Sequence, residues 1–363
     1  MKPWIKYLNI YEPGKPIEEV SRELGFSDID DIIKVASNEN EWGPSPKAIK
    51  AIKDNASLMH RYPDGGSYYL RNHLANHLDV NSNQIIFGNG SNELIVFLAH
   101  LFLEPNKELL MSEKAFAVYA LATKLFQGDL IQVPMNNFTH DLDSIFEAIT
   151  PNTRLITIVN PNNPTGTAVD PNLLIDFIKS VPRDVIVILD EAYYEIMPKE
   201  LRGDSISLIR NGVENLIILR TFSKGHGLAG LRIGYGISNN ELISNLNRIR
   251  QPFNINLMAQ KAAIAAIDDI DHIEKTYKGT KDGCEYLTHE LKEMGFDIVP
   301  TAANFILVKT YNGRKWFENL QKHKIIVRAM DGYGLPDYIR ITVGKYDQNK
   351  VILKAMSQLK NLI

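Results

Sequence analysis

The sequence predicts an α/β protein with a three-layer α/β/α larger domain, built on a mainly parallel sheet, and a smaller α+β domain. Continuous apolar runs, typical of strands buried on both faces, alternate with amphipathic helices up to Gly236. After Gly236 the pattern changes to long helices followed by short strands. The 363 residues are also too many for one small core.

The larger domain is expected to begin at about residue 45 and to repeat strand and helix in turn. Ser45 and Pro46 mark the start of a helix over 46–54, and Ser67 is expected to cap a helix that ends near residue 78. Strands are expected at 84–87, 130–133, 155–159, 185–189, 216–219 and 231–235, with helices ending near 103 and over 114–126, 142–149, 172–179 and 206–210.

The smaller domain is expected to combine the last hundred residues with part of the N-terminal arm. The arm contains a helix at 16–24 and a strand at 33–40. The C-terminal part contains helices over 239–250, 256–294, 314–323 and 347–360 and strands over 297–299, 304–309, 325–328 and 338–343. The expected domains are therefore 1–44 (the arm and part of the small domain), 45–255 (large) and 256–363 (small).

Composition indicates a cytoplasmic enzyme or binding protein. The net charge of −3 argues against nucleic acid or an anionic membrane as the main partner. The longest apolar run, 94–103, is too short to span a bilayer, and the first ten residues do not resemble a signal peptide. The single cysteine, Cys284, excludes an intramolecular disulfide and suits a reducing compartment.

Polar residues at three expected strand ends indicate a site. Lys224 follows the strand at 216–219, Asp190 closes another, and Asn163 lies in a loop after a third. The carboxyl ends of parallel strands line a crevice, where a lysine is partly desolvated and becomes a usable amine nucleophile or Schiff-base partner. An aspartate there needs a cationic partner. Taken alone, Lys224 also fits a solvated loop lysine.

The segment 88–93 joins a strand to a helix and is a candidate anion site. Its glycines let backbone N–H groups approach a ligand, and a helix N-terminus favours an anion. An ordinary helix capped by Asn89 or Ser91 is the alternative. No metal site is expected: His73 and His77 stand four residues apart, but no nearby glutamate completes a zinc motif.

Several motifs together resemble a known family. Asn163-Pro164-Thr165-Gly166, Asp190 with Tyr193, and Ser223-Lys224 with Arg232 resemble the signature of fold-type I pyridoxal-phosphate aminotransferases. The resemblance covers nearly the whole chain. It narrows to the histidinol-phosphate aminotransferase branch on these segments: Tyr11-x-Pro-Gly14, 37–40, 43–46, 61–65, Phe116-Ala-Val-Tyr119 and 335–344.

The resemblance implies pyridoxal 5'-phosphate as the cofactor and assigns residues to it. Lys224 would bind the cofactor as a Schiff base and then move the proton at the substrate Cα. Asp190 would hold the pyridinium nitrogen protonated, Asn163 and Tyr193 would bind the ring hydroxyl, and Phe116 would stack on the ring. The phosphate would be held by Gly90, Ser91, Asn92, Thr221, Ser223 and Arg232, with Tyr62 from a second subunit, which implies a homodimer.

The resemblance also implies the substrates, L-histidinol phosphate and 2-oxoglutarate, which exchange an amino group by a ping-pong route. Arg340 would bind the anionic end of either substrate, helped by Arg328, Tyr11 and Asn38. An arginine fork binds a phosphate or a carboxylate in a bidentate manner. The chain departs from the family pattern at Gly225 and His226, where an alanine and an aromatic residue are expected, and at Phe116, which replaces a frequent tyrosine.

Two other functions stay open on the sequence alone. An aromatic-amino-acid aminotransferase or an L-threonine-O-3-phosphate decarboxylase would use the same cofactor residues. A non-catalytic protein of the same fold is the second alternative. Loss of Lys224 or Asp190 would favour it, and neither residue is lost.

Overall fold

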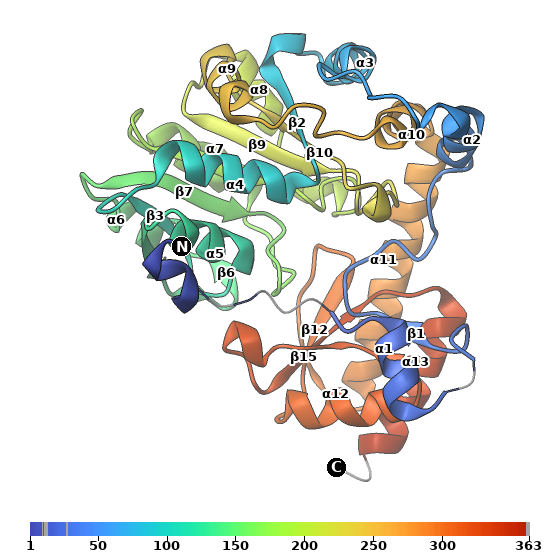
Figure 1. Cartoon of the computed structure of the whole chain (residues 1–363). Coiled ribbons are helices and arrows are strands. Elements are labelled where there is room, and N and C mark those ends of the chain that lie inside the picture. The colour runs from blue at the N-terminus through green and yellow to red at the C-terminus, as the bar shows by residue number, and fades with distance from the viewer. Residues whose placement is uncertain (9, 11–13, 27, 361–363) are drawn as a thin grey trace.

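The computed structural model describes residues 1–8, 10, 14–26 and 28–360, most of which surround two separate β-sheets (Figure 1). The larger sheet has seven strands, in the order β2-β10-β9-β8-β7-β3-β4. Their bounds are β2 (Ile85–Gly88), β10 (Gly234–Ile237), β9 (Leu216–Thr221), β8 (Ile186–Asp190), β7 (Thr153–Val159), β3 (Glu108–Ser112) and β4 (Asp129–Val133).

The larger sheet is mainly parallel, as predicted. Only β10 runs antiparallel, to β2 on one side and β9 on the other. The strand β3, between β7 and the edge strand β4, was not expected from the sequence, because its apolar run covers only Leu109–Met111 between Glu108 and Ser112. β10 begins three residues later than expected, since Arg232 adopts a left-handed conformation (φ 56°) that interrupts the extended chain.

Helices cover both faces of this sheet, which confirms the three-layer prediction. On one face α4, α5 and α9 pack around one core, and the remaining helices pack around a second core on the other face. Their bounds are α2 (Pro46–Asn55), α3 (Tyr68–Leu78), α4 (Ser91–Phe102), α5 (Ala117–Leu125), α6 (Leu142–Glu147), α7 (Pro171–Ser180), α8 (Ser205–Arg210), α9 (Asn240–Ile249) and α10 (Leu257–Ile267).

The smaller domain is a four-stranded antiparallel sheet in the order β11-β12-β15-β14, packed against helices (Figure 1). The strands are β11 (Asp297–Val299), β12 (Phe305–Lys309), β15 (Tyr338–Thr342) and β14 (Arg328–Ala329), and the helices are α1 (Ile17–Leu24), α11 (Ile270–Glu293), α12 (Gly313–Lys322) and α13 (Tyr346–Lys360). The expected strand 325–328 is divided: β13 (Ile325–Ile326) pairs in parallel with β1 (Ile33–Lys34), so part of the N-terminal arm joins this domain.

Short elements complete the described chain. They are the hairpin β5 (Met135–Asn136) and β6 (Thr139–His140), and the 3-10 helices η1 (Pro3–Tyr7), η2 (Ala56–Leu58), η3 (Ser82–Gln84), η4 (Lys199–Leu201), η5 (Ala229–Leu231) and η6 (Asp331–Tyr333). The first of these, η1, lies against α5, where Trp4 Nε1 donates to the Leu125 carbonyl at 3.2 Å. No helix of the described residues has both the length and the apolar character needed to cross a bilayer.

The helix α10 belongs to the larger core, although the predicted boundary assigns it to the small domain. The expected helix 256–294 breaks at 268–269, and the buried alanines of α10 pack with α2 and α3. The next helix, α11, extends from the larger domain to the smaller one in Figure 1. We therefore propose that the domains divide within α11 rather than at residue 256.

Two predicted helix caps have different outcomes. Ser45 Oγ accepts from the backbone N–H groups of Lys47 and Ala48 at 3.1 and 3.3 Å, as predicted. The predicted cap by Ser67 is wrong, because its side chain makes no capping bond and its φ is 51°. Asp64 caps the helix in place of Ser67. Its carboxylate accepts from the N–H of Tyr68 at 2.6 Å, across a short loop that contains Gly65 and Gly66.

Candidate active site

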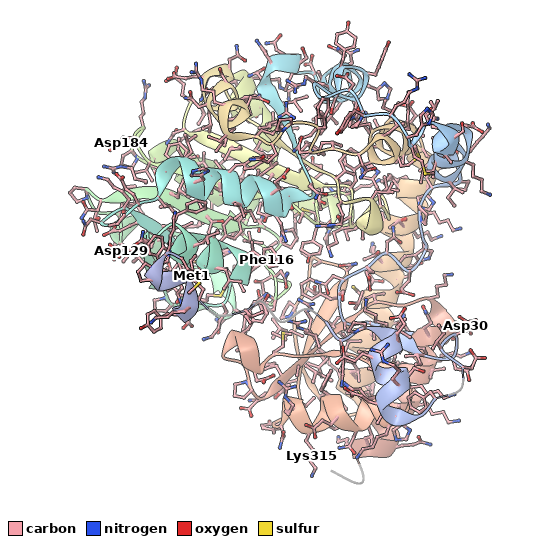
Figure 2. The ribbon with its side chains drawn as sticks, viewed as in Figure 1. Met1, Asp30, Phe116, Asp129, Asp184 and Lys315 are labelled. Atoms are coloured by element: carbon pink, nitrogen blue, oxygen red, sulfur yellow. The ribbon has the colours of Figure 1, made fainter. Side chains whose placement is uncertain are left out.

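A cavity of about 400 Å³ lies between the two domains, at the carboxyl ends of β7, β8 and β9. Figure 2 shows Phe116 at the edge of the larger domain that faces the smaller one. The cavity is lined by fourteen of the predicted site residues: Asn38, Gly90, Ser91, Asn92, Phe116, Asn163, Asp190, Tyr193, Thr221, Ser223, Lys224, Arg232, Arg328 and Arg340. Residues that are far apart in the sequence therefore meet in one place.

Lys224 lies in the cavity wall three residues after β9 ends. Its Nζ donates to the carbonyl oxygens of Ser37 and Asn38, each at 3.0 Å. Burial lowers the pKa of Lys224 to about 7, and the charge of Arg340 contributes in the same direction. The structure thus rules out the solvated-loop interpretation: the amine is held by backbone acceptors, and a large fraction of it is neutral at pH 7.

Asp190 is the last residue of β8 and is only 3% exposed. Its Oδ1 accepts from the Ala192 N–H at 3.1 Å and its Oδ2 accepts from the Tyr119 hydroxyl at 2.8 Å. Burial raises the pKa of Asp190 to about 6, although both hydrogen bonds oppose this rise. A cation placed in the cavity beside this carboxylate would offset the cost of burying it.

Tyr119 is a site residue that was not predicted. It is fully buried in α5, and burial followed by the neighbouring charge of Asp190 raises its pKa well above the usual range, so its hydroxyl stays a hydrogen-bond donor. Phe116 lies three residues before Tyr119, and the two rings pack edge to face with their centroids 6.4 Å apart. One signal was available: a tyrosine on the core-facing side of a helix needs a partner for its hydroxyl.

We expect Tyr119→Phe to raise the pKa of Asp190, because it removes a hydrogen bond that stabilises the carboxylate. Affinity of the cofactor-free protein for its cofactor should fall by about tenfold near pH 7, the order expected for one hydrogen bond to a charged group. Fluorescence titration from pH 5.5 to 8 measures this. Tyr286→Phe, which alters a tyrosine remote from the cavity, is the control. Equal affinities of wild type and Tyr119→Phe at every pH would contradict the role.

A buried hydrogen-bond network joins the two domains beside the cavity. The Tyr193 hydroxyl accepts from Asn38 Nδ2 at 2.9 Å, and Arg340 donates to Asn163 Oδ1 at 2.5 Å and to the Ala36 carbonyl at 2.8 Å. Asn38 has a φ of 55°, a conformation that asparagine tolerates better than most residues. Burial raises the pKa of Tyr193 to about 12, although Arg340 opposes this, so its hydroxyl is protonated.

The two arginines of the smaller domain form a candidate anion site. Arg328 on β14 and Arg340 on β15 lie directly opposite each other in the antiparallel sheet. Like charges at such positions destabilise a sheet. Both side chains line the cavity, and a planar guanidinium binds phosphate or carboxylate in a bidentate manner. An anion between them would offset their repulsion.

A second candidate anion site lies at the N-terminus of α4, where Gly90, Ser91 and Asn92 line the cavity. The N-cap residue of α4 is Gly90, which has no side chain to cap the first N–H groups, so neither Asn89 nor Ser91 is the N-cap of the alternative prediction. A Cβ on Gly90 would lie 2.6 Å from Arg232 Nη2, so glycine is needed to bring this guanidinium to the helix end. Thr221 and Ser223 add hydroxyls 3.0 Å apart.

Two other residues discussed from the sequence, Tyr62 and His73, do not line the cavity. Tyr62 is 83% exposed and stacks on Phe253 with ring centroids 4.8 Å apart, outside this chain's cavity. Tyr11 is not among the described residues. His73 hydrogen-bonds Asp268 at 2.7 Å, and the described residues contain no group of metal-ligating side chains that would include it.

Comparison with known proteins identifies the family. The model of the family "Aminotransferase class I and II" matches residues 30–356. A histidinol-phosphate aminotransferase of Moorella thermoacetica is 44% identical over 350 residues, which are 96% of this chain and 90% of that protein. The chain belongs to the histidinol-phosphate aminotransferase family.

Other members of the histidinol-phosphate aminotransferase family agree with this assignment. The histidinol-phosphate aminotransferase of Desulfotalea psychrophila is 44% identical over 362 residues, covering 99% of this chain and 95% of that protein. The crystal structure of the Sinorhizobium meliloti enzyme, in complex with pyridoxal-5'-phosphate, superposes with a TM-score of 0.90 at 26% identity, covering 100% of this chain and 98% of that one. The predicted family and fold are therefore confirmed.

Proposed function

We propose that the protein transfers the amino group of L-histidinol phosphate to 2-oxoglutarate, giving imidazole acetol phosphate and L-glutamate, as a step of histidine biosynthesis. One observation carries this proposal: a low-pKa lysine, a buried aspartate and two opposed arginines line one cavity. Curated relatives more than 40% identical over almost the whole chain, named histidinol-phosphate aminotransferases, support it over the aromatic aminotransferase and decarboxylase alternatives.

The cavity fits pyridoxal 5'-phosphate as the cofactor. The open N-terminus of α4, with Arg232 beside it, suits a phosphate dianion. Asp190 suits a protonated ring nitrogen, and Phe116 offers an aromatic face. When bound, this cofactor supplies an electron sink for the bond that breaks at the substrate Cα.

Residues of the chain would anchor the cofactor, transfer the proton and orient the cofactor ring. Lys224 would hold the cofactor, and its amine would accept and return the proton at the substrate Cα; a pKa near 7 suits an amine to both directions of that transfer. Ser37 and Asn38 hold the amine through their carbonyl oxygens. Asn163 and Tyr193 would orient the cofactor ring; Asn163 is itself held by Arg340, and Tyr193 by Asn38.

Arg340 and Arg328 hold the anionic end of each substrate. L-Histidinol phosphate presents a phosphate and 2-oxoglutarate presents a carboxylate. A pair of guanidinium groups can bind either anion. Since Arg340 also bonds Asn163, substrate binding and cofactor position are linked through one side chain. Tyr11 is proposed as a further phosphate ligand on the family resemblance alone.

Substrate comparison tests the function. We expect kcat/KM with 2-oxoglutarate as acceptor to be at least about 100-fold higher for L-histidinol phosphate than for phenylalanine or tyrosine, the order that several buried hydrogen bonds to the phosphate would give. A parallel assay should detect no decarboxylation of L-threonine O-3-phosphate. A higher kcat/KM for either aromatic amino acid, or rapid carbon dioxide release, would contradict the proposal.

We also propose that the protein acts as a homodimer in which Tyr62 reaches the partner's cofactor phosphate. Exposed apolar side chains around Tyr62 support this: Met59, Tyr68, Tyr69 and Phe253 are 71%, 65%, 71% and 46% exposed. Such patches mark interaction surfaces. Light scattering should give twice the 41.0 kDa chain mass. Tyr62→Phe should weaken cofactor binding without changing that mass; a monomeric wild type would contradict the proposal.

A cytoplasmic location is proposed on composition. The single cysteine, Cys284, is half-buried, donates to the Ala303 carbonyl at 3.4 Å, and has its pKa raised by burial to about 12, so it is an inert thiol. The net charge of −3 gives no electrostatic attraction to nucleic acid or anionic lipid, so small molecules and a second subunit are the proposed partners.

A further inference from the structure

Glu39 is an acidic residue in a cavity whose other charged side chains are mostly cationic. The cavity is also lined by Lys224, Arg232, Arg328 and Arg340. Among the described lining residues the one other carboxylate is Asp190, which already accepts from Tyr119 and Ala192. Glu39 therefore introduces a negative charge into a region where the two anion sites need positive charge.

The carboxylate of Glu39 is held by one lysine. Lys34 on β1 places its Nζ 3.0 Å from Oε2 and 3.2 Å from Oε1. A carboxylate has about four acceptor sites, and one ammonium leaves some of them available to a ligand donor. The side chain of Glu39 is 41% exposed, so a molecule entering the cavity has access to it.

Glu39 lies beside Lys224 in the cavity: both residues line it, and Lys224 Nζ donates to the carbonyl of Asn38, the residue before Glu39, at 3.0 Å. Burial lowers the pKa of Lys224 and Arg340 lowers it further, whereas Glu39 raises it. The backbone at this position is also fixed, since Asn304 Nδ2 donates to the carbonyl oxygens of Asn38 and Glu39, each at 3.2 Å. A substrate that reaches Lys224 in this cavity therefore also has Glu39 in the cavity wall.

We propose that Glu39 selects the amino donor by accepting a hydrogen bond from the imidazole N–H of L-histidinol phosphate, an inference that rests on the proposed function. A phenyl ring offers no such donor. The same carboxylate repels the second carboxylate of L-glutamate, so it favours one amino donor and disfavours the other. Glu39 is then a specificity residue, distinct from the arginines that bind the end common to both substrates.

A structural ion pair is the competing explanation. Partly exposed ion pairs between lysine and glutamate usually contribute little to stability. If Glu39 served only to hold Lys34, then Lys34→Gln and Glu39→Gln would have the same effect on turnover. If Glu39 binds the imidazole, only Glu39→Gln removes the acceptor charge, and the two variants differ.

The test compares two amino donors in the holoenzyme. kcat/KM is measured for L-histidinol phosphate with 2-oxoglutarate and for L-glutamate with imidazole acetol phosphate. The first value is divided by the second to give a ratio of donor preference. We expect Glu39→Gln to lower this ratio by about tenfold or more, the order for a hydrogen bond to a charged acceptor. Glu39→Asp, which keeps the charge, should lie between. Glu41→Gln is the matched control, because Glu41 lies two residues on and bonds Gln348 outside the cavity.

The outcomes separate the two proposals. A lower ratio in Glu39→Gln, with Glu41→Gln and Lys34→Gln at or above the wild-type ratio, supports the specificity role. An unchanged ratio, or an equal fall for both donors in Glu39→Gln and Lys34→Gln, overturns it. Failure of the wild-type enzyme to use L-histidinol phosphate would instead overturn the proposed function. Circular dichroism identifies a variant that does not fold, in which case Glu39→Asp decides.

Discussion

Lys224→Ala is expected to lower kcat by about 10⁴-fold, because it removes both the proposed covalent anchor and the proposed base for the Cα proton. In the wild type, borohydride reduction followed by peptide mass spectrometry should locate the cofactor on the peptide that contains Lys224. The variant should lack this adduct. It should also fold normally, since the amine it loses is buried at an energetic cost, as its lowered pKa shows.

A lysine outside the cavity lining provides the control. Lys114 pairs with Glu113 at 3.4 Å and does not line the cavity. Lys114→Ala should keep both the adduct and a kcat within about twofold of wild type, as is usual for a surface substitution. An adduct of undiminished yield in Lys224→Ala would show that another residue carries the cofactor.

Asp190→Asn is expected to lower kcat/KM by about 10²- to 10³-fold, the effect of removing one preorganised charge from an active site. Asparagine has nearly the same shape and keeps an acceptor for the Tyr119 hydroxyl, so the loss reports the charge rather than the packing. Steady-state kinetics at saturating cofactor measure it. A kcat/KM within threefold of wild type would contradict the role of Asp190.

The same substitution should stabilise the cofactor-free protein. The pKa of Asp190 is about 6 in the fold and 3.8 in the reference state, so the folded state binds more protons between these values. Stability therefore falls as pH rises from 4 to 6, by up to about 3 kcal/mol, and stays lower above pH 6. Urea unfolding should show Asp190→Asn more stable than wild type at pH 8 and equal to it at pH 4. The opposite order would disprove the raised pKa.

The sequence by itself was sufficient for the framework of the protein. Alternation of buried strands with helices is a local pattern, and the ends of parallel strands lie side by side in any such sheet. For this reason Lys224, Asp190 and Asn163 could be assigned to one site before any contact was known. The family motifs around them extended the assignment to the two anion sites, and all fourteen of the predicted residues named above line one cavity.

Tertiary structure alone decided features that depend on contacts between distant segments. The short apolar run of β3 can be identified as a strand only because β7 and β4 pair with it, and α10 joins the larger core because its alanines pack against α2. The partnership of Tyr119 with Asp190 spans 71 residues, and the cavity position of Glu39 depends on how the N-terminal arm crosses between the domains. The hydrophobic periodicity of the sequence indicates which face of a helix or strand is buried. Which other elements that face contacts is determined only by tertiary packing.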